Sequence, residues 1–384
     1  MHEVTAALPS PLTLDDHHPM GMDHLLDEAL GPGGLRIQPF RISLADAGVT
    51  LADVLAHPRV GRVHLLEVAR QALLPREIDT LLAWPALDHV RSLAIHINEL
   101  GAEGVLRLLR SPRLSQLQRL EMHCAEGRPA SQQDAVRYLE ALVHSTPLPN
   151  LRRLRFGAHE GGAEAGAVVG AFTSFPRLEA FEYGLTPGSG NAVIGSLVQN
   201  PRMAALRTLG LDATDVDGDG LRPLLASGKT HALRTLSLRC SELGDEGFEA
   251  LARAREALPS LERLVISSGM RATSAPLPVL ARAELPRLRW LEVDGAEFRS
   301  DGLRALAGAG FLPGLLGLSL RGDLLEMGSV AKLLRDPRLG GLRRLQLNGW
   351  KLDQDGLALF RTQPGVAEAV LEQRFGDSYE QSVS

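Results

Sequence analysis

Aromatic residues are scarce in this sequence. They make up 4% of its 384 residues, whereas hydrophobic residues as a whole make up 44%. The interior must therefore be aliphatic, built mainly from Leu, Val and Ala, a composition that suits thin and regular packing layers. Cysteine is scarce as well, and Cys124 and Cys240 stand more than a hundred residues apart. We therefore expect no disulfide, and a reducing compartment is favoured.

Long apolar runs and an excess of one charge are also lacking. No stretch approaches the roughly 18 apolar residues of a membrane span, and the N-terminus has neither the basic region nor the continuous apolar stretch of a secretory signal. The 41 basic and 46 acidic residues give a net charge of -5, which provides no global field to attract nucleic acid or an anionic membrane. We expect a cytoplasmic protein that binds neither. Abundant Ala, Arg, Gly and Leu with little Lys is typical of a GC-rich bacterial genome.

A repeated motif runs through the sequence. An aliphatic residue, two variable residues, an aliphatic, one variable and an aliphatic recur as "VRSLAI" at 90, "LQRLEM" at 117, "LRRLRF" at 151, "LEAFEY" at 178, "LRTLGL" at 206, "LRTLSL" at 233, "LERLVI" at 261, "LRWLEV" at 288, "LLGLSL" at 315 and "LRRLQL" at 342. Successive starts differ by 27 or 28 residues, with one interval of 34. "VGRVHL" at 60 is interpreted as an earlier copy, and "IQPFRI" at 37 as the opening of the array.

Each repeat predicts one strand and one helix. The alternation in the second half of the motif indicates a strand with one buried face, and helical spacing follows, as in "EGFEALARAREA" from Glu246 and "DGLRALAGAG" from Asp301. One such unit cannot bury its own apolar faces, so units must stack in the same sense. We predict an α/β solenoid shaped as a horseshoe, with a parallel β-sheet on the concave face and helices on the convex face.

The domain boundaries follow from the extent of the repeat. Residues 37–360 are predicted to form the solenoid of about 11–12 repeats. Residues 1–36 are interpreted as an N-terminal cap that covers the first repeat, with a docking peptide as the alternative. Residues 361–384 are predicted to form a C-terminal cap and tail.

The fullest copy of the repeat is "LRTLSLRCSELGDEGFEAL", from Leu233 to Leu251. It resembles the leucine-rich repeat superfamily, and within it the ribonuclease-inhibitor-like subclass, over roughly residues 60 to 360. The resemblance implies the horseshoe architecture. GTPase-activating relatives share this architecture, so the resemblance also leaves open a regulatory or accessory subunit of an enzyme.

The stretch "TDVDGDGL", residues 214 to 221, offers two interpretations, a calcium loop or a repeated turn. In an EF-hand loop beginning at Asp215, the twelfth position would be a bidentate glutamate, but it is Ala226. The triplet Asp219-Gly220-Leu221 also stands at the phase of Glu246-Gly247-Phe248 and Asp301-Gly302-Leu303. We therefore predict that the carboxylates satisfy amides at a helix start and that the glycine permits a tight turn.

The variable residues that flank the buried strand positions are predicted to face the hollow of the arc. Early repeats place there Arg62, His64, His96, Arg119, Glu121, His123, Arg153 and Arg155, and later ones Glu182, Asp212, Arg239, Arg263, Trp290, Glu292, Asp294, Arg321, Arg344, Gln346 and Asn348. An uneven stripe of charge suits an uneven protein surface. The predicted partner-binding residues are Arg239, Arg263, Trp290, Glu292, Asp294, Arg321, Arg344, Arg119, His123, Arg153 and Arg155.

Trp290 is the most informative residue of this set. An outward-facing Trp on a strand would leave a large apolar surface in water, and Trp and Arg are enriched among residues that anchor interfaces. The binding hypothesis is therefore centred on Arg239, Arg263, Trp290, Glu292 and Asp294. The alternative is that Trp290 merely packs on Arg263 beside it.

No chemistry-bearing constellation stands out. There is no nucleophile in a recognisable turn, no paired metal-binding His motif and no phosphate loop, so we predict no enzyme and no cofactor. His96 and His123 share a column, with Cys124 next and His159 one repeat further, but they lack the tight pairs of a zinc site. We predict no metal. Metal or pH sensing through this His column stays an alternative.

Overall fold

The computed structural model describes residues 40–42, 51–56, 65–68, 75–96, 100–123, 132–143, 148–157, 162–184, 187–268, 276–294, 300–321, 332–333 and 335–348. The chain divides into two compact units. The first comprises Met1–Gly161 and Ala171–Glu179, and the second comprises Gly162–Gly170 and Ala180–Ser384. The predicted boundaries at 36/37 and 360/361 lie outside the described residues, so the predicted domains stay a prediction.

The first unit repeats strand and helix in alternation. Its strands are β1 (Phe40–Ile42), β2 (Leu65–Val68), β3 (Ser92–His96), β4 (Arg119–His123) and β5 (Arg153–Gly157). Its helices are α2 (Leu51–Ala56), α3 (Pro75–Ala83), α4 (Gly101–Leu109) and α5 (Gln132–Val143), with the short 3-10 helices η2 (Pro85–His89) and η3 (Pro112–Leu114).

The second unit continues the same alternation. Its strands are β6 (Ala180–Gly184), β7 (Thr208–Asp212), β8 (Thr235–Ser241), β9 (Arg263–Ser268), β10 (Trp290–Asp294), β11 (Gly317–Arg321) and β12 (Arg344–Asn348). Its helices are α6 (Gly162–Gly170), α7 (Gly190–Gln199), α8 (Gly218–Ala226), α9 (Gly244–Ala252), α10 (Pro276–Leu280) and α11 (Ser300–Ala307), with η4 (Pro201–Ala205), η5 (Leu312–Gly314) and η6 (Pro337–Gly341).

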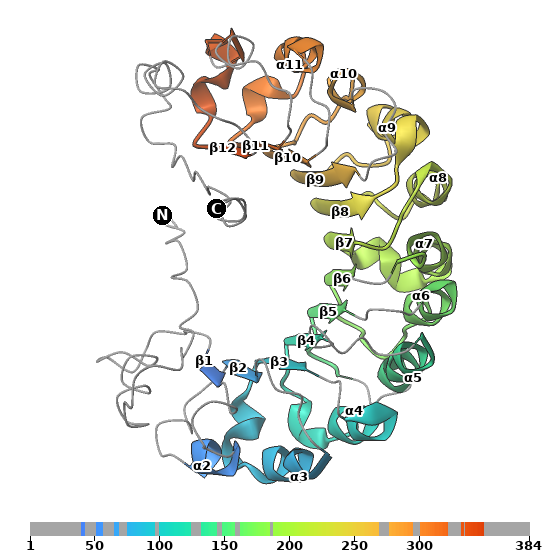
Figure 1. Ribbon diagram of the computed structural model, residues 1–384, viewed down its shortest axis with the longest axis vertical. Helices are drawn as coiled ribbons and strands as arrows, with labels where there is room; N and C mark the ends of the chain where they lie inside the picture. Colours follow the sequence, from blue (N-terminus) through green and yellow to red (C-terminus); the bar gives the residue numbers. More distant parts are fainter. Residues whose placement is uncertain are drawn as a thin grey trace, which may run out of the picture. The chain divides into compact units, whose positions relative to one another are not determined.

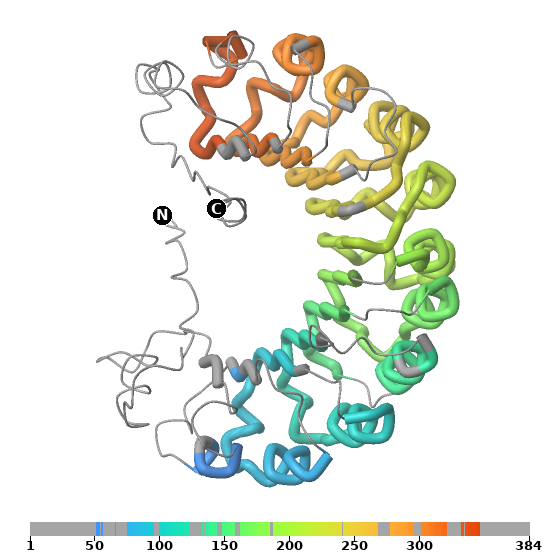
Figure 2. The backbone as a smooth tube through the Cα atoms, viewed as in Figure 1, coloured from blue at the N-terminus to red at the C-terminus, as the bar shows by residue number. Residues whose placement is uncertain are grey.

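Strands consecutive in the sequence pair in parallel within each unit. β1 to β5 follow one another in the first unit, and β6 to β12 do so in the second. In each unit the described α-helices lie on one side of its strands (Figure 1), and the backbone trace repeats the same path of strand, turn and helix (Figure 2). The predicted α/β repeat solenoid with a parallel sheet is confirmed.

The core is the stack of motif leucines. The middle aliphatic positions of the motif pair across neighbouring strands and are at most 1% exposed in Leu209, Leu236, Leu264, Leu291, Leu318 and Leu345. The side chains of a strand alternate between its faces, so the variable residues on either side of each leucine lie on the opposite face. This alternation positions the residues of the candidate site.

The repeat at residue 60 was predicted in the wrong register. β2 pairs Leu66 with Leu93 and Val68 with Ile95, so the motif of this repeat is "VHLLEV" from Val63, three residues later than predicted. "VGRVHLLEV" contains two overlapping alternations of apolar residues, and only the later one matches the period of 27 that leads to Val90. In this register the residues that flank Leu66 are Leu65 and Glu67, whereas Arg62 and His64 lie outside the described residues. β1 confirms the opening motif at 37.

Within the described part of the chain, no helix is long and apolar enough to cross a membrane.

Candidate functional site

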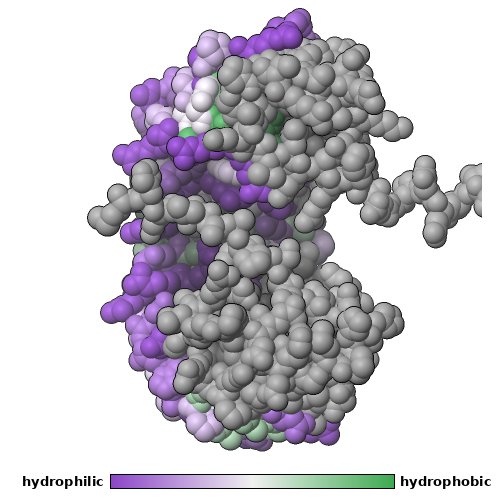
Figure 3. All heavy atoms as spheres, turned by 90° about the vertical axis from the view of Figure 1, so that its left-hand side faces the viewer, coloured by the Kyte–Doolittle hydropathy of each residue, from purple (hydrophilic) through white to green (hydrophobic). Residues whose placement is uncertain are grey.

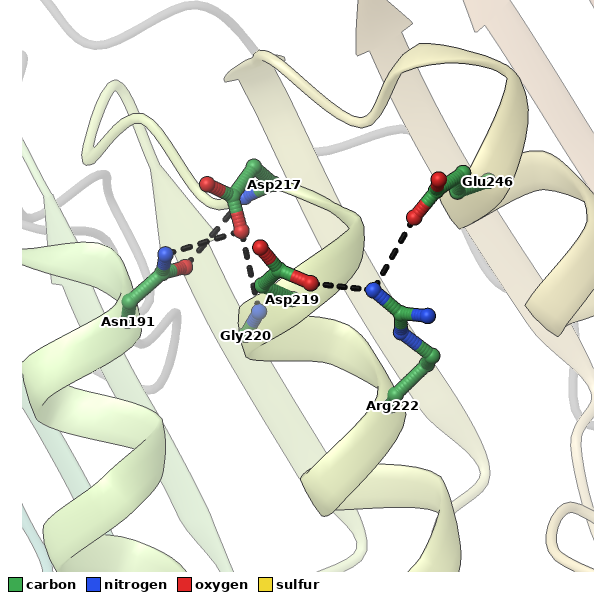
Figure 4. Close-up of polar contacts among 6 residues, drawn as sticks. All are labelled: Asn191, Asp217, Asp219, Gly220, Arg222 and Glu246. Atoms are coloured by element: carbon green, nitrogen blue, oxygen red, sulfur yellow. Dashed lines mark hydrogen bonds and ion pairs between the residues drawn. The ribbon is translucent and has the colours of Figure 1, made fainter.

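The carboxylates of "TDVDGDGL" are used in local structure. Asp217 is the N-cap of α8: its Oδ1 accepts the backbone N–H of Gly220 at 2.9 Å and the Asn191 side-chain amide at 2.8 Å (Figure 4). Asp219 pairs with Arg222, whose guanidinium also lies 2.9 Å from Glu246 of the next repeat. A capping carboxylate satisfies an otherwise free amide and complements the helix dipole. The prediction of a repeated helix start is confirmed at this turn.

The predicted role of the glycine at this turn is wrong. Gly220 lies inside α8 without a positive φ, and a Cβ there would stand 2.0 Å from Oδ1 of Asn191, so its smallness permits close approach of the preceding repeat. The left-handed conformation occurs three positions earlier in the repeat, at Gly244, whose φ is +54° where α9 begins. Glycine adopts that conformation without the steric penalty of a Cβ.

Two non-glycine residues with positive φ flank the fully buried Thr214. Ala213 has φ +53° and Asp215 has φ +57°. The conformation is held by the Ala213 N–H, which donates to the Arg239 carbonyl at 2.7 Å, by the Gly190 N–H, which donates to the Thr214 carbonyl at 2.7 Å, and by the Asp215 carboxylate, which accepts the Gly188 N–H at 3.0 Å. Backbone strain is thus retained between β7 and α8 by bonds to both neighbouring repeats.

Replacing Ala213 with glycine is expected to stabilise the protein by about 0.5 kcal/mol. The left-handed conformation costs an L-residue about 1–2 kcal/mol, and the greater freedom of glycine in the unfolded chain cancels about 0.5–1 kcal/mol of that gain. Urea unfolding measures the change, with Ala226→Gly at the exposed end of α8 as the matched control that is expected to destabilise. Equal destabilisation by both variants would show that the backbone at Ala213 is not strained.

The outward positions of the second unit form rows across its strands. We call the first, third and fifth residues of β7 to β12 the open face. The first row contains Thr208, Thr235, Arg263, Trp290, Gly317 and Arg344. The coloured surface visible in Figure 3 is predominantly hydrophilic. In this row Trp290 stands between Arg263 and Gly317, and Arg344 lies one strand beyond Gly317.

The guanidinium groups of Arg263 and Arg344 both lie over the Trp290 indole. The Cζ of Arg263 lies 5.2 Å from the ring centroid and that of Arg344 lies 5.5 Å from it. The indole lies over Gly317, where a Cβ would be 2.2 Å from the Trp290 Cε3. Cation–π contacts of this kind contribute roughly 0.5–1 kcal/mol each at exposed positions. Trp290 is accordingly half-buried rather than fully exposed, and it packs on Arg263 as the alternative interpretation proposed.

The indole nitrogen of Trp290 is buried without a hydrogen-bond partner among the described residues. An unpaired buried N–H costs roughly 1–3 kcal/mol. The local packing of Gly317, Arg263 and Arg344 therefore holds the ring in place against this cost.

Glu292 links two arginines on the same face. Its Oε1 accepts a hydrogen bond from Nη2 of Arg239 at 2.7 Å, and its Oε2 lies 3.5 Å from Nη2 of Arg263. The Glu292 side chain is 23% exposed, whereas those of Arg239 and Arg263 are 46% and 44% exposed. One half-buried carboxylate thus orients two exposed guanidinium groups beside Trp290.

The remaining predicted residues of this unit lie at the far ends of their strands. Asp294 pairs in register with Ser267 and Arg321, and the Arg321 side chain lies outside what the structure describes. Sequence reasoning passed over Asp212 as a bonding partner: its carboxylate accepts the Ser237 hydroxyl at 2.7 Å and the Arg239 N–H at 3.2 Å. It also missed Gly317, although a glycine one repeat after a tryptophan at the same position is a readable signal.

The first unit brings its predicted residues onto neighbouring strands. Arg119 donates from Nε to Glu121 at 2.8 Å, and Arg119 pairs in register with Arg153 and Glu121 with Arg155. His96 and His123 are backbone neighbours across β3 and β4, but their side chains lie outside the described set, as do Cys124 and His159. No group of three or more His, Cys, Asp or Glu among the described residues is arranged to hold a metal ion.

The carboxyl of Asp336 has a strongly shifted pKa. The Arg338 guanidinium, and next the Arg338 backbone N–H, hydrogen-bond to Asp336 and lower the pKa of its carboxyl to about 2. The same pair raises the pKa of Arg338. Because the pKa is depressed in the folded state, the contribution of this pair to stability is present above about pH 4 and is lost as the pH falls toward 2.

No family model matches this chain, and no curated protein matches it. A chain in the crystal structure of the yeast Rad7 and Elc1 complex is similar at 16% identity and a TM-score of 0.45, over 76% of this chain and 77% of that one. A protein from Bacteroides fragilis is similar at 14% identity and a TM-score of 0.38, over 80% of this chain and 76% of that one. At these values the likeness carries no argument about function.

Proposed function

We propose that this protein is a non-enzymatic interaction scaffold that binds a protein partner on the concave face of a leucine-rich repeat of the ribonuclease-inhibitor-like subclass. The subclass is supported by the 27- to 28-residue period together with the helix start at Asp217. The binding surface is the open face of the second unit. We propose neither nucleic acid nor a membrane as a partner, and we propose no catalytic step.

The observation that carries this proposal is the arrangement around Trp290. An aromatic ring beneath two arginine guanidinium groups, with a carboxylate orienting one of them, is ordered before a partner arrives. Interfaces concentrate their binding energy in a few such Trp and Arg anchors. Side chains that are already positioned lose less conformational freedom on association, which leaves more of the contact energy for affinity.

The double variant Trp290→Ala, Arg263→Ala is expected to lose partner binding. Truncation of an anchor costs about 2 kcal/mol or more, which corresponds to roughly 30-fold in affinity for each residue. Pull-down from the native host with quantitative mass spectrometry measures the loss. Arg253→Ala, Arg304→Ala, two exposed arginines of the helical side, serve as the matched control and are expected to keep the partners.

A third variant tests whether binding depends on where the Trp290 ring lies and not only on its presence. Gly317→Ala keeps both anchors but places a Cβ where the indole lies, so it is expected to displace Trp290 and to weaken binding as well. Circular dichroism shows whether each variant is folded. Unchanged recovery of partners by the folded double variant would refute the placement of the binding surface.

A further inference from the structure

The strand starts of the second unit form an edge rich in arginine. The two residues at the start of each strand from β7 to β12 stack in register, because the residue that precedes each of β8 to β12 donates its N–H to the carbonyl of its counterpart one strand earlier at 2.8 Å. We call the exposed arginines at these positions the basic rim: Arg207, Arg234, Arg263, Arg289, Arg343 and Arg344. Arg263 and Arg344, the two arginines over the Trp290 ring, belong to this rim.

The charge of this edge is far from balanced. Six arginines stand against one glutamate, Glu262, which lies 3.4 Å from Arg234, so the formal charge is +5. Acidic side chains gather instead where β7 and β8 end and α8 and α9 begin, at Asp212, Asp215, Asp217, Asp219, Glu242, Asp245 and Glu246. Among the described residues of the second unit, positive charge therefore gathers at the strand starts and negative charge beyond the ends of β7 and β8, although the whole chain carries a net charge of only -5.

Local structure accounts for only some of these arginines. Arg289 donates to the Gly314 carbonyl at 2.9 Å, and a cation near the carbonyl end of a short helix is favourable. Arg207 and Arg343, at the two ends of the basic rim, make no side-chain hydrogen bond or ion pair with any described residue. Their charge is available to a partner.

Resting on the proposed function, we propose that the basic rim binds an extended acidic segment of the protein partner, with an apolar side chain of that segment against Trp290. Guanidinium groups bind carboxylates through paired N–H donors, and Arg207 and Arg343 carry such groups exposed at the two ends of the rim. Five strand spacings of about 4.8 Å span about 24 Å, which matches about seven extended residues at about 3.3 Å each.

An acidic peptide suits the surface better than nucleic acid. Single-stranded nucleic acid is held by successive aromatic side chains along a basic groove, and Trp290 is the one aromatic residue among the strand-start positions of β7 to β12. Glu292 and Asp294 continue from Trp290 down the same strand and would repel a phosphate backbone that crossed the open face. Carboxylates confined to the rim avoid both residues.

The test is selection of a random peptide library displayed on phage against the full chain. The peptides recovered are expected to be enriched in Asp and Glu around one aromatic or aliphatic residue. A synthetic peptide of the recovered consensus is expected to bind roughly tenfold more weakly to Arg207→Glu, Arg343→Glu than to the unmodified protein, and its Asp→Asn, Glu→Gln analogue is expected to fail to bind. Arg253→Glu, Arg304→Glu changes the net charge equally on the helical side and is expected to leave binding unchanged.

Each outcome decides between the two proposals. Peptides without acidic bias whose binding is abolished by Trp290→Ala would overturn the acidic segment and leave the proposed function standing. Acidic peptides that bind equally to Arg207→Glu, Arg343→Glu and to Arg253→Glu, Arg304→Glu would have their site elsewhere. That result would overturn the assignment of the binding site to the basic rim. If a single-stranded oligothymidine is bound tightly by the unmodified protein but not by Arg207→Glu, Arg343→Glu, that result would identify nucleic acid, and not an acidic peptide, as the ligand of the rim. Recovery of no peptide would count against both proposals.

Discussion

Gly170→Ala is expected to destabilise the second unit by about 3 kcal/mol, at the upper end of what overpacking usually costs. A Cβ at this position would stand 2.0 Å from the Ser196 Cβ and 2.8 Å from the Leu197 backbone nitrogen. The backbone of α7 cannot turn away as a side chain would. Two bonds also hold α7 against α6, from the Ser196 hydroxyl to the Ala167 carbonyl at 3.0 Å and from the Asn200 amide to the Gly170 carbonyl at 2.8 Å.

Gly195 supplies the matched control for this prediction. It lies in α7 with nothing within 4 Å of the position that its Cβ would take, so Gly195→Ala is expected to stabilise the helix by about 0.5–1 kcal/mol. Thermal unfolding should therefore move in opposite directions, down by roughly 6–12 °C for Gly170→Ala and up by a few degrees for Gly195→Ala. A gain for both variants would show that α6 and α7 do not pack as closely as described.

The fold was predictable because its determinants recur. Each motif leucine stands at the phase of the next, so an error in one repeat is corrected by its neighbours. The misplaced register at residue 60 illustrates the rule, because two alternations overlap in "VGRVHLLEV" and the period of 27 alone distinguishes them. The capping role of a carboxylate at this turn was predictable for a different reason. A carboxylate before a helix start has a local meaning that does not depend on the neighbouring strand.

The face on which the candidate residues lie was predictable, but the contacts among them were not. The alternation of β10 placed Trp290 and Glu292 on one face, yet the position of the indole depends on the missing side chain of Gly317 one strand away. Glu292 likewise meets Arg239 of β8, which is two strands distant. Such contacts depend on rotamers and on side-chain reach across the sheet, and neither has a signature in a single repeat. The role of Gly220 was misjudged for a related reason, because its neighbour Asn191 belongs to another repeat.

Leu236→Ala is expected to cost about 3 kcal/mol, since Leu→Ala at a fully buried position removes apolar contacts and leaves a cavity. Leu236 is 0% exposed in the middle of the motif leucines, whereas the adjacent Thr235 is half-buried on the opposite face. Thr235→Ala is therefore expected to change stability by less than about 0.5 kcal/mol. Urea unfolding of the two variants measures the two changes in stability. It therefore tests directly which side chains of β8 point into the core and which point outward. Similar costs for both, or a larger cost for Thr235→Ala, would reverse the faces of β8 and with them the assignment of Arg263 and Trp290 to a surface that a partner reaches.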